Sequence, residues 1–383
     1  MERYAHITGW GMAVPEKVLT NDDLARMVDT SDNWIRTRTG IRERRIAGPR
    51  DSTASLSVEA AQNALEVADI APDDVDLIIV ATSTPEHLMP ATASLVQDAL
   101  GATKAGGFDL LAACSGFVYA LTVGAQVIRS GAMQNVLVIG AETLSRVVNW
   151  NDRGTCILFG DGAGAFLLQG SGVPGGVLST LLRSDGSGAS SLIIPAGGSR
   201  MPASFNTVRE HLHAIQMDGK EVYRFATRVM AAATREVVQD AGLKLDDVRL
   251  IVPHQANRRI IESAARSLEL PQEKFFMNLE RYGNTSAASI PIACCEAVEQ
   301  GRLRSNDHAV LIGFGAGLTW GAALVKWDVT VKPEVSRWNQ LRRRAVYGLA
   351  KVRSSLRRGV RRVEGVIYGS DVPENGHKTP PRK

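Results

Sequence analysis

Short hydrophobic runs alternate with amphipathic stretches along most of this chain. One run completes "APDDVDLIIVAT" (71–82) and a similar run lies in "KLDDVRLIVPHQ" (244–255), each after an acidic turn. Both runs are rich in leucine and β-branched residues, which predicts strands buried on both faces. Each run follows a stretch with helical spacing of apolar positions, "VEAAQNALEVADI" or "RVMAAATREVVQDAG". This order predicts an α/β protein in which helices cover a largely parallel sheet.

The chain contains an internal repeat. The two segments above lie 173 residues apart, and "NVLVIGAET" matches "HAVLIGFGA" at the same offset. Between them, "SGFVYALTVGAQVIRSG" matches "TSAASIPIACCEAVEQG" at an offset of 170, which aligns Cys114 with Asn284. The repeat predicts two halves related by a pseudo-twofold axis, with nearly uncharged central helices at 116–130 and 286–300. Equivalent loops of the two halves would then meet at one cleft.

Length and charge divide the chain further. Its 383 residues exceed the usual size of a single hydrophobic core. We expect an N-terminal half at 1–172, a C-terminal half at 173–328 and an extension at 329–383. The extension holds 14 basic and 4 acidic residues, a net charge of +10, whereas the first 328 residues hold 30 and 36, a net charge of −6.

Cysteine usage and hydropathy bear on the compartment. The four cysteines lack the regular spacing of a disulfide framework and the CxxC and histidine clusters of a zinc site. The opening "MERYAHITGW" lacks the apolar core of a signal peptide, and the longest uncharged run, 309–325, is shorter than a membrane span. We therefore expect a cytoplasmic protein.

Cys114 is the first candidate for chemistry. It lies in "LAACSGFVYAL", after the strand-like "FDLL" and at the start of a helical pattern. The positive end of a helix stabilises a thiolate and lowers the pKa of its thiol, which would make Cys114 a nucleophile near neutral pH. The alternative is a structural cysteine, the commoner fate of a free thiol.

Two residues of the second half complete a candidate set. His254 follows the predicted strand in "LIVPHQANRR", and Asn284 precedes the central helix in "YGNTSAAS". Taken alone, His254 is more often a surface or core histidine, and Asn284 is more often a helix cap. On converging loops they would form a Cys/His/Asn set with Cys114.

Six motifs together resemble those of β-ketoacyl-acyl-carrier-protein synthase III, an initiating condensing enzyme of the thiolase fold. They are "DTSDNWIRTRTGIRERR", "AACSGF", "DRGTCILFGDGAGA", "VPHQAN", "RYGNTSAAS" and "GFGAGLTWGAALV", and they occur in order from residue 1 to about 327. The resemblance implies a thiolase-like fold with two β/α halves in a five-layered αβαβα arrangement. It also implies an acyltransferase of fatty acid biosynthesis that needs no cofactor and no metal.

The resemblance assigns the chemical steps to residues. Cys114 would take a short acyl group, such as acetyl, from coenzyme A. His254 and Asn284 would then donate hydrogen bonds to the malonyl thioester oxygen, on which decarboxylation builds negative charge. The backbone N–H groups of Cys114 and Ala316 would form the oxyanion hole, and Phe314 would be an apolar gate beside the cysteine. Many members carry glycine where this chain has Ala316.

The resemblance also assigns partners. Trp34, Arg38 and Arg153 would bind coenzyme A, and Arg258 and Arg259 would dock the acidic acyl carrier protein.

A homodimer is implied as well. Met89 would line the acyl pocket of the partner subunit across the dimer interface. The other cysteines, Cys156, Cys294 and Cys295, are expected to be structural. Two alternatives stay open: a condensing or acyl-transferring relative from secondary metabolism, and a noncatalytic scaffold, which would not need the Cys/His/Asn set.

The extension at 329–383 has a pattern of its own. Apolar residues in steps of three and four form a stripe: Trp338, Leu341, Ala345, Leu349, Val352, Leu356, Val360, Val363 and Ile367. Arginines flank this stripe, which predicts a basic amphipathic helix followed by a flexible end at 373–383. Such a helix suits an anionic membrane surface or an acidic partner such as the carrier protein, and nucleic acid is the least favoured partner. Alternatively, the stripe packs on the acidic surface of residues 1–328, called the body below, or on a second copy of the chain. The extension could also become ordered only when it binds a partner.

Overall fold

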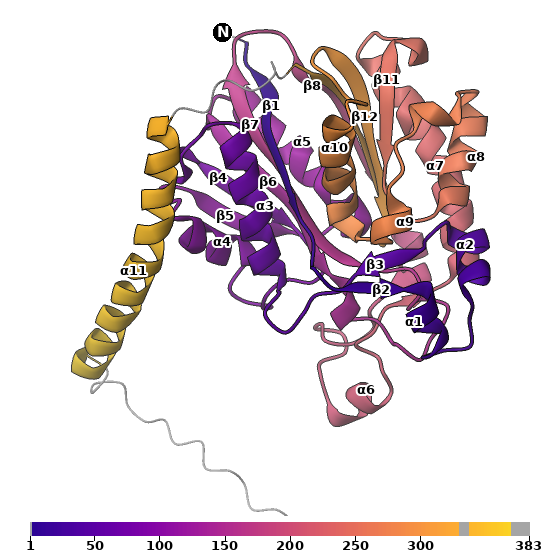
Figure 1. Ribbon diagram of the computed structural model, residues 1–383, viewed down its shortest axis with the longest axis horizontal. Coiled ribbons are helices and arrows are strands. Elements are labelled where there is room, and N and C mark those ends of the chain that lie inside the picture. Colours follow the sequence, from indigo (N-terminus) through magenta and orange to yellow (C-terminus); the bar gives the residue numbers. More distant parts are fainter. Residues whose placement is uncertain (1, 329–336, 369–383) are drawn as a thin grey trace, which may run out of the picture.

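The computed structural model describes residues 2–328 and 337–368 and contains two main sheets (Figure 1). The first sheet has the strand order β1–β7–β6–β4–β5. Its strands are β1 (Tyr4–Ala13), β4 (Leu77–Ala81), β5 (Gly106–Leu110), β6 (Asn135–Thr143) and β7 (Asp161–Ser171). The three strands β6, β4 and β5 run parallel, and β7 is antiparallel to both β6 and β1.

The second sheet repeats this arrangement with four strands. Its order is β11–β12–β13–β8, with β8 (Gly176–Ser184), β11 (Val248–Pro253), β12 (Asp307–Gly315) and β13 (Thr319–Trp327). The pair β11–β12 is parallel and the pairs β12–β13 and β13–β8 are antiparallel, as in the series β4–β6–β7–β1. The predicted internal repeat is therefore present, and each sheet belongs to one copy.

Helices and sheets form five layers. The outer layer of the first sheet consists of α3 (Thr53–Val67) and α4 (Thr92–Leu100), and α7 (Gly219–Asp240) and α8 (Arg258–Leu268) form the outer layer of the second half (Figure 1). Between the sheets lie α5 (Gly116–Arg129) and α10 (Ser289–Glu299). Their apolar side chains share one buried cluster with residues from both sheets. This confirms the expected thiolase-like αβαβα fold.

The structure corrects one detail of the repeat. A short 3₁₀ turn precedes each central helix, at Ala113–Ser115 before α5 and at Ser286–Ala288 before α10, so the helices repeat at an offset of 173. The first residue of each turn has the same rare backbone conformation, with φ of 46° at Ala113 and 48° at Ser286. The equivalent of Cys114 is thus Ala287, and the alignment of Cys114 with Asn284 is wrong.

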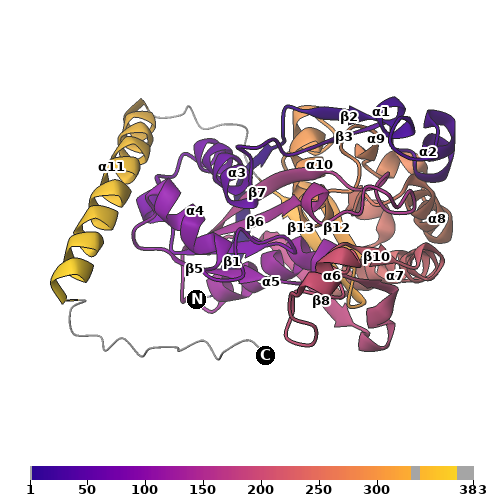
Figure 2. The same ribbon diagram turned by 90° about the horizontal axis from the view of Figure 1, so that it is seen from below.

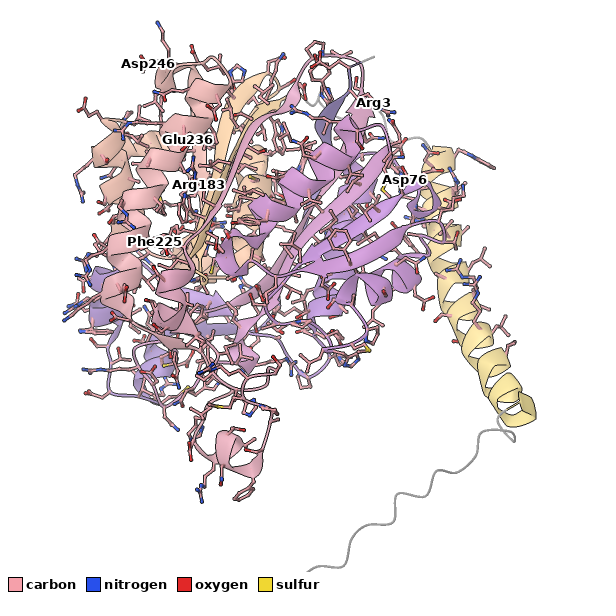
Figure 3. The ribbon with its side chains drawn as sticks, turned by 180° about the vertical axis from the view of Figure 1, so that it is seen from behind. Arg3, Asp76, Arg183, Phe225, Glu236 and Asp246 are labelled. Carbon is pink, nitrogen blue, oxygen red and sulfur yellow. The ribbon has the colours of Figure 1, made fainter. Side chains whose placement is uncertain are left out.

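The second outer layer is fixed to its sheet by specific contacts. Arg183 on β8 forms an ion pair with Glu236 on α7 (Figure 3). Phe225, also on α7, packs edge-on against Trp320 of β13 with ring centroids 5.5 Å apart.

The remaining elements are short: β2 (Val18–Thr20), α1 (Asn21–Ala25), α2 (Asp32–Thr39), β3 (Glu43–Arg45), β9 (Leu192–Ile193), α6 (Phe205–Arg209), β10 (Gln216–Met217) and α9 (Leu279–Tyr282).

The predicted basic helix is present as α11 (Arg337–Tyr368), which lies outside the first half, beside α4 (Figure 2). Near its start, Arg342 forms ion pairs with Asp73 and Asp74 at 2.8 and 2.9 Å, and Arg343 pairs with Asp69 at 2.8 Å. The basic helix therefore docks on acidic residues of the body. The end expected to be flexible, 373–383, lies outside the described residues.

The docked face of α11 is not the apolar stripe. Its buried residues are Arg343, Ala350 and Ser354, and the Ser354 hydroxyl donates to Asp98 at 2.5 Å. Gly101 has a φ of 79° and lies so close that a Cβ there would be 2.9 Å from Val346. The idea that the stripe packs on the acidic body is wrong for the described side chains, which do not include those of Val363 and Ile367. Across the described part of the chain, no helix combines the length and the hydropathy needed to cross a bilayer.

Candidate active site

Cys114 lies between β5 and α5, in the 3₁₀ turn that leads into the central helix. It is a free, buried cysteine, and the end of β12 packs against it. A Cβ at Gly315 would lie 2.6 Å from the Cys114 nitrogen and 3.1 Å from its Cβ, so only glycine fits there. Ala316 follows Gly315 directly in the chain.

The protonation state of Cys114 differs from the expectation. Burial raises the pKa of the Cys114 thiol to about 12, and the nearby Glu142 carboxylate adds to the rise. A hydrogen bond with the Ser286 side chain favours the thiolate, but this is the smaller effect. The predicted lowering of the pKa is therefore wrong here. Removal of water destabilises the thiolate more than the hydrogen bond with Ser286 stabilises it. A nucleophilic thiolate then requires a group that accepts the proton.

Glu142 on β6 is a candidate for that group. Its carboxylate is buried and accepts hydrogen bonds from the Ser286 hydroxyl at 3.0 Å and the Thr84 hydroxyl at 2.6 Å. Burial raises the pKa of Glu142 to about 7, although these hydrogen bonds oppose the rise. Ser286 thus connects Cys114 to a carboxyl group that titrates near neutral pH. The sequence reasoning missed Glu142, although a lone acid in the apolar run "NVLVIGAET" was a visible signal.

His254 follows β11 and is fully buried. Burial lowers the pKa of His254 to about 3, so the ring is neutral. Its Nδ1 lies 2.7 Å from the hydroxyl of Ser289, which also accepts the Gln255 N–H at 3.4 Å. The Phe314 ring packs edge-on against the imidazole at a centroid distance of 5.2 Å. Ser289 ends the motif "RYGNTSAAS", and the sequence pattern alone does not reveal its contact with His254.

Asn284 is buried and held by its own backbone. Its N–H donates to Leu158 O at 2.8 Å, and its carbonyl accepts the Gly160 N–H at 3.0 Å. The side-chain Oδ1 accepts the Ser286 N–H at 2.8 Å. This bond fixes the orientation of the amide, so that Nδ2, its only donor group, can donate to a ligand.

The segment Ser286–Ser289 at the start of α10 joins the three candidates. Ser286 hydrogen-bonds both Cys114 and Asn284, and Ser289 hydrogen-bonds His254. The structure therefore brings a thiol from the first half and an imidazole and a carboxamide from the second half to one helix end. A neutral imidazole and an amide can stabilise a developing oxyanion without themselves carrying a repelling charge.

Of the residues expected to bind coenzyme A, Trp34 and Arg38 line one surface cleft, and Arg153 lies beside Trp34. The guanidinium groups of Arg38 and Arg153 each lie 5.5 Å from the Trp34 ring centroid, and Arg153 pairs with Asp29 at 3.1 Å. Trp34 and Arg38 line a cleft of about 1190 Å³. Its other walls come from segments near Ile157, Met217, Tyr223 and Asn257.

A basic groove adjoins this cleft. Arg259 lines both the cleft and a smaller groove of about 310 Å³, in which Arg258 also lies. Arg36 and Arg42 line the same groove and were not singled out from the sequence. The sequence signal for them was present in the arginine-rich "WIRTRTGIRERR".

Met89 is exposed on the loop before α4, beside the exposed Leu88. Phe108 on β5 is also exposed, and β5 is an edge strand of the first sheet.

Cys156, Cys294 and Cys295 are free and buried in hydrophobic clusters or the central helix. Among the described residues, no three histidine, cysteine or acidic side chains are grouped so that they could hold a metal ion.

The fold and the comparisons with known proteins define an acyltransferase of the condensing-enzyme class with a thiolase-like fold. The family model of 3-oxoacyl-[acyl-carrier-protein] synthase III matches residues 108–186, and the model of its C-terminal part matches 238–327. The chain belongs to this β-ketoacyl-[acyl-carrier-protein] synthase III family, whose members start fatty acid synthesis.

Several relatives support the assignment. A β-ketoacyl-[acyl-carrier-protein] synthase III of Roseiflexus sp. is 54% identical over 85% of this chain and 99% of the relative, and one of Symbiobacterium thermophilum is 56% identical over 84% and 97%. The crystal structure of a synthase III from Thermus thermophilus has a TM-score of 0.80 and 46% identity, covering 85% of this chain and all of that one.

Proposed function

We propose that the chain condenses a short acyl group from coenzyme A with malonyl-acyl carrier protein, using Cys114 as the nucleophile. The Cys114 sulfur forms a bond to the acyl carbon while the bond from that carbon to the sulfur of coenzyme A breaks. Loss of carbon dioxide from the malonyl group then leaves an enolate, whose carbon attacks the acyl group on Cys114 and breaks the bond from the acyl carbon to the sulfur. The released Cys114 thiolate takes up one proton from solvent, which restores the thiol. The meeting of Cys114, His254 and Asn284 around Ser286–Ser289 carries this proposal.

Ser286 and Glu142 provide a path for the thiol proton. As Cys114 attacks, its proton passes to the Ser286 oxygen, and the Ser286 proton passes to the Glu142 carboxylate. Two observations support this path: the hydrogen bond from Ser286 to Glu142 at 3.0 Å and the pKa of Glu142 of about 7. The proton finally neutralises the thiolate of the departing coenzyme A.

His254 and Asn284 stabilise the second step. If Ser289 donates to Nδ1 of His254, the ring proton resides on Nε2 and is available to the malonyl thioester oxygen. The free Nδ2 of Asn284 is the second donor. The backbone N–H groups of Cys114 and Ala316 take the oxyanion of the acyl-transfer step, supported by the close packing of Gly315 on Cys114. Phe314 closes the apolar side of the same site.

Substrate binding follows from the cleft and the groove. Trp34 offers an aromatic face for the adenine, and Arg38 and Arg153 offer positive charge for the phosphates. Arg258 and Arg259 bind the acidic carrier protein, together with Arg36 and Arg42 at the same groove.

A homodimer completes the proposed enzyme. Exposed backbone groups of an edge strand pair readily with a second strand, and β5 is such a strand. The exposed side chains of Leu88, Met89 and Phe108 lie on or near it and would be covered by a partner. In that dimer Met89 reaches the acyl pocket of the other subunit. We place the enzyme in the cytoplasm, where both substrates are made.

The proposal is tested by following the acyl group. After incubation with acetyl-CoA, mass spectrometry of the intact chain is expected to show one acetyl group, located on Cys114 by peptide mapping. The variant Cys114→Ala is expected to remain unmodified, whereas Cys156→Ala, which changes another buried free cysteine, takes up the label. Variants of His254 or Asn284 are expected to accept the acetyl group but to form little product with malonyl-carrier protein. Label on another residue, or normal condensation by Cys114→Ala, would contradict the proposal.

A further inference from the structure

Helix α11 presents two opposite faces. One face, with Arg343, Ala350 and Ser354, is buried against the body. The opposite face carries large hydrophobic residues that are 54% to 73% exposed. This apolar face consists of Trp338, Leu341, Leu349, Val352, Leu356 and Val360.

The apolar face is long and continuous. From Trp338 to Val360 the helix rises by about 33 Å, at about 1.5 Å per residue. Scattered exposed hydrophobic residues are common on protein surfaces, but a continuous stripe of six marks a binding surface. The stripe also borders a hollow of about 760 Å³ between α11 and the Gly101–Thr103 loop. A partner therefore has to cover a narrow apolar strip about 33 Å long.

Positive charge surrounds the apolar face. Residues 337–368 include ten lysines and arginines and one glutamate. Arg344 is exposed on one flank of the face, and Arg353 and Arg357 lie on the other flank. An apolar stripe between two rows of basic side chains is the pattern of helices that lie in the surface of an anionic bilayer.

We propose that the apolar face of α11 binds an anionic lipid bilayer and holds the enzyme at the membrane surface. The hydrophobic side chains would enter the boundary between headgroups and acyl chains, and the flanking arginines would contact lipid phosphates. Acidic groups on a partner would satisfy the arginines alone, whereas an anionic bilayer also covers the apolar strip. The contacts of Arg342 and Arg343 with aspartates of the body hold the helix so that the side chains of this face stay exposed.

The proposed dimer strengthens this arrangement, and this step alone rests on the proposed function. The twofold axis of two antiparallel β5 strands is perpendicular to their sheet, so helices on the same outer side of the sheet stay on the same side of the dimer. Both copies of α11 would then face one bilayer. Two weak membrane contacts in one dimer bind far more tightly than one.

Flotation of the full-length protein with lipid vesicles tests the proposal. We expect binding to vesicles of phosphatidylcholine mixed with phosphatidylglycerol, weaker binding to phosphatidylcholine alone, and a decrease at high salt. The double variant Leu349→Gln/Leu356→Gln is expected to bind at least about tenfold more weakly, because burial of each leucine contributes about a factor of ten. The matched control Phe205→Gln, which removes an exposed aromatic residue of α6, is expected to bind normally.

Two results would contradict the membrane proposal, and a third would assign the apolar face to another partner. Absence of the full-length protein from the floated anionic vesicles, or unchanged binding by the double variant, would overturn the proposal. A lower oligomeric state of the double variant in size-exclusion chromatography would assign the face to a second copy of the chain instead. Acetylation and condensation rates of the double variant in solution are expected to match those of the unmodified sequence. A failure of the membrane proposal therefore leaves the catalytic proposal intact, and the reverse also holds.

Discussion

The Ser286 hydroxyl donates a hydrogen bond of 3.0 Å to the Glu142 carboxylate, while also hydrogen-bonding the Cys114 side chain. Ser286 comes from the second half of the fold, and Cys114 and Glu142 come from the first. The proton path of the proposed acylation therefore exists only when both halves are assembled.

Glu142→Gln is expected to slow acetylation of Cys114 by about a hundredfold or more, because a general base contributes about that much. The pKa of Glu142 is about 7, so the acetylation rate of the unmodified sequence is expected to rise with pH through 7 and then level off. This inflection is expected to vanish in the variant. Stopped-flow release of coenzyme A at several pH values measures both effects.

A control distinguishes a relay from general damage to the site. Ser286→Ala interrupts the same path, so the double variant with Glu142→Gln is expected to be no slower than the slower single variant. An unchanged pH inflection in Glu142→Gln would exclude Glu142 as the proton acceptor.

Ser289→Ala is expected to affect condensation but not acetylation. Loss of the 2.7 Å hydrogen bond to Nδ1 leaves the imidazole of His254 free to take the other tautomer, in which Nε2 no longer donates. Condensation is expected to fall about tenfold to a hundredfold, as for the loss of one buried hydrogen bond. Single-turnover assays that separate the two half-reactions provide the measurement.

Ser289→Thr, which retains the hydroxyl, is the matched variant and is expected to recover much of the rate. An equal loss in both half-reactions would indicate a general structural effect of Ser289 rather than positioning of His254.

The sequence predicted the parts of this structure that depend on local pattern. Apolar runs located β4 and β11, and the repeat revealed two equivalent halves. The offset of 170 was wrong because α10 has 11 residues and α5 has 14, so the glycines after the two helices lie 170 apart although the helices begin 173 apart. Side-chain pattern alone does not reveal where a turn with positive φ lies. The shared φ at Ala113 and Ser286 settles the register.

The chemistry was harder to predict where it depends on burial. A helix start suggested a low pKa for Cys114, but the surrounding protein removes water and raises it. Glu142 and Ser286 are 144 residues apart, and no local pattern pairs them. In α11 the periodicity predicted the stripe correctly, while its outward direction depends on Arg342 and Arg343 meeting aspartates of the body.

Acid is expected to destabilise the fold through His254. Burial lowers the pKa of His254 from 6.5 to about 3, so the unfolded chain binds a proton between these values and the folded chain does not. The contribution of His254 to stability is thus complete above pH 6.5 and is lost as the pH falls towards 3. Between pH 6.5 and 4.5 the loss amounts to roughly 2 kcal/mol. Glu142 has the opposite sign, because its pKa is raised from 4.5 to about 7 and acid favours its folded form.

Urea unfolding at several pH values separates the two groups. His254→Asn is expected to lose less stability between pH 6.5 and 4.5 than the unmodified sequence, whatever its stability at neutral pH. His211→Asn changes an exposed histidine and is expected to follow the unmodified profile. Parallel profiles for His254→Asn and the unmodified sequence would show that His254 does not remain neutral in the folded state.

Gly315→Ala is expected to impair acetylation more than any later step. The added Cβ would lie 2.6 Å from the Cys114 nitrogen, so either β12 or the 3₁₀ turn that contains Cys114 has to move. This movement would separate the two backbone N–H groups of the proposed oxyanion hole. Overpacking of this kind typically costs about 1 to 3 kcal/mol of stability, and a displaced oxyanion donor lowers the rate about a hundredfold or more. Gly186→Ala is the control, because a Cβ there meets no atom within 4 Å. Thermal unfolding and coenzyme A release measure the two effects, and full activity of Gly315→Ala would mean that this strand end does not set the geometry of Cys114.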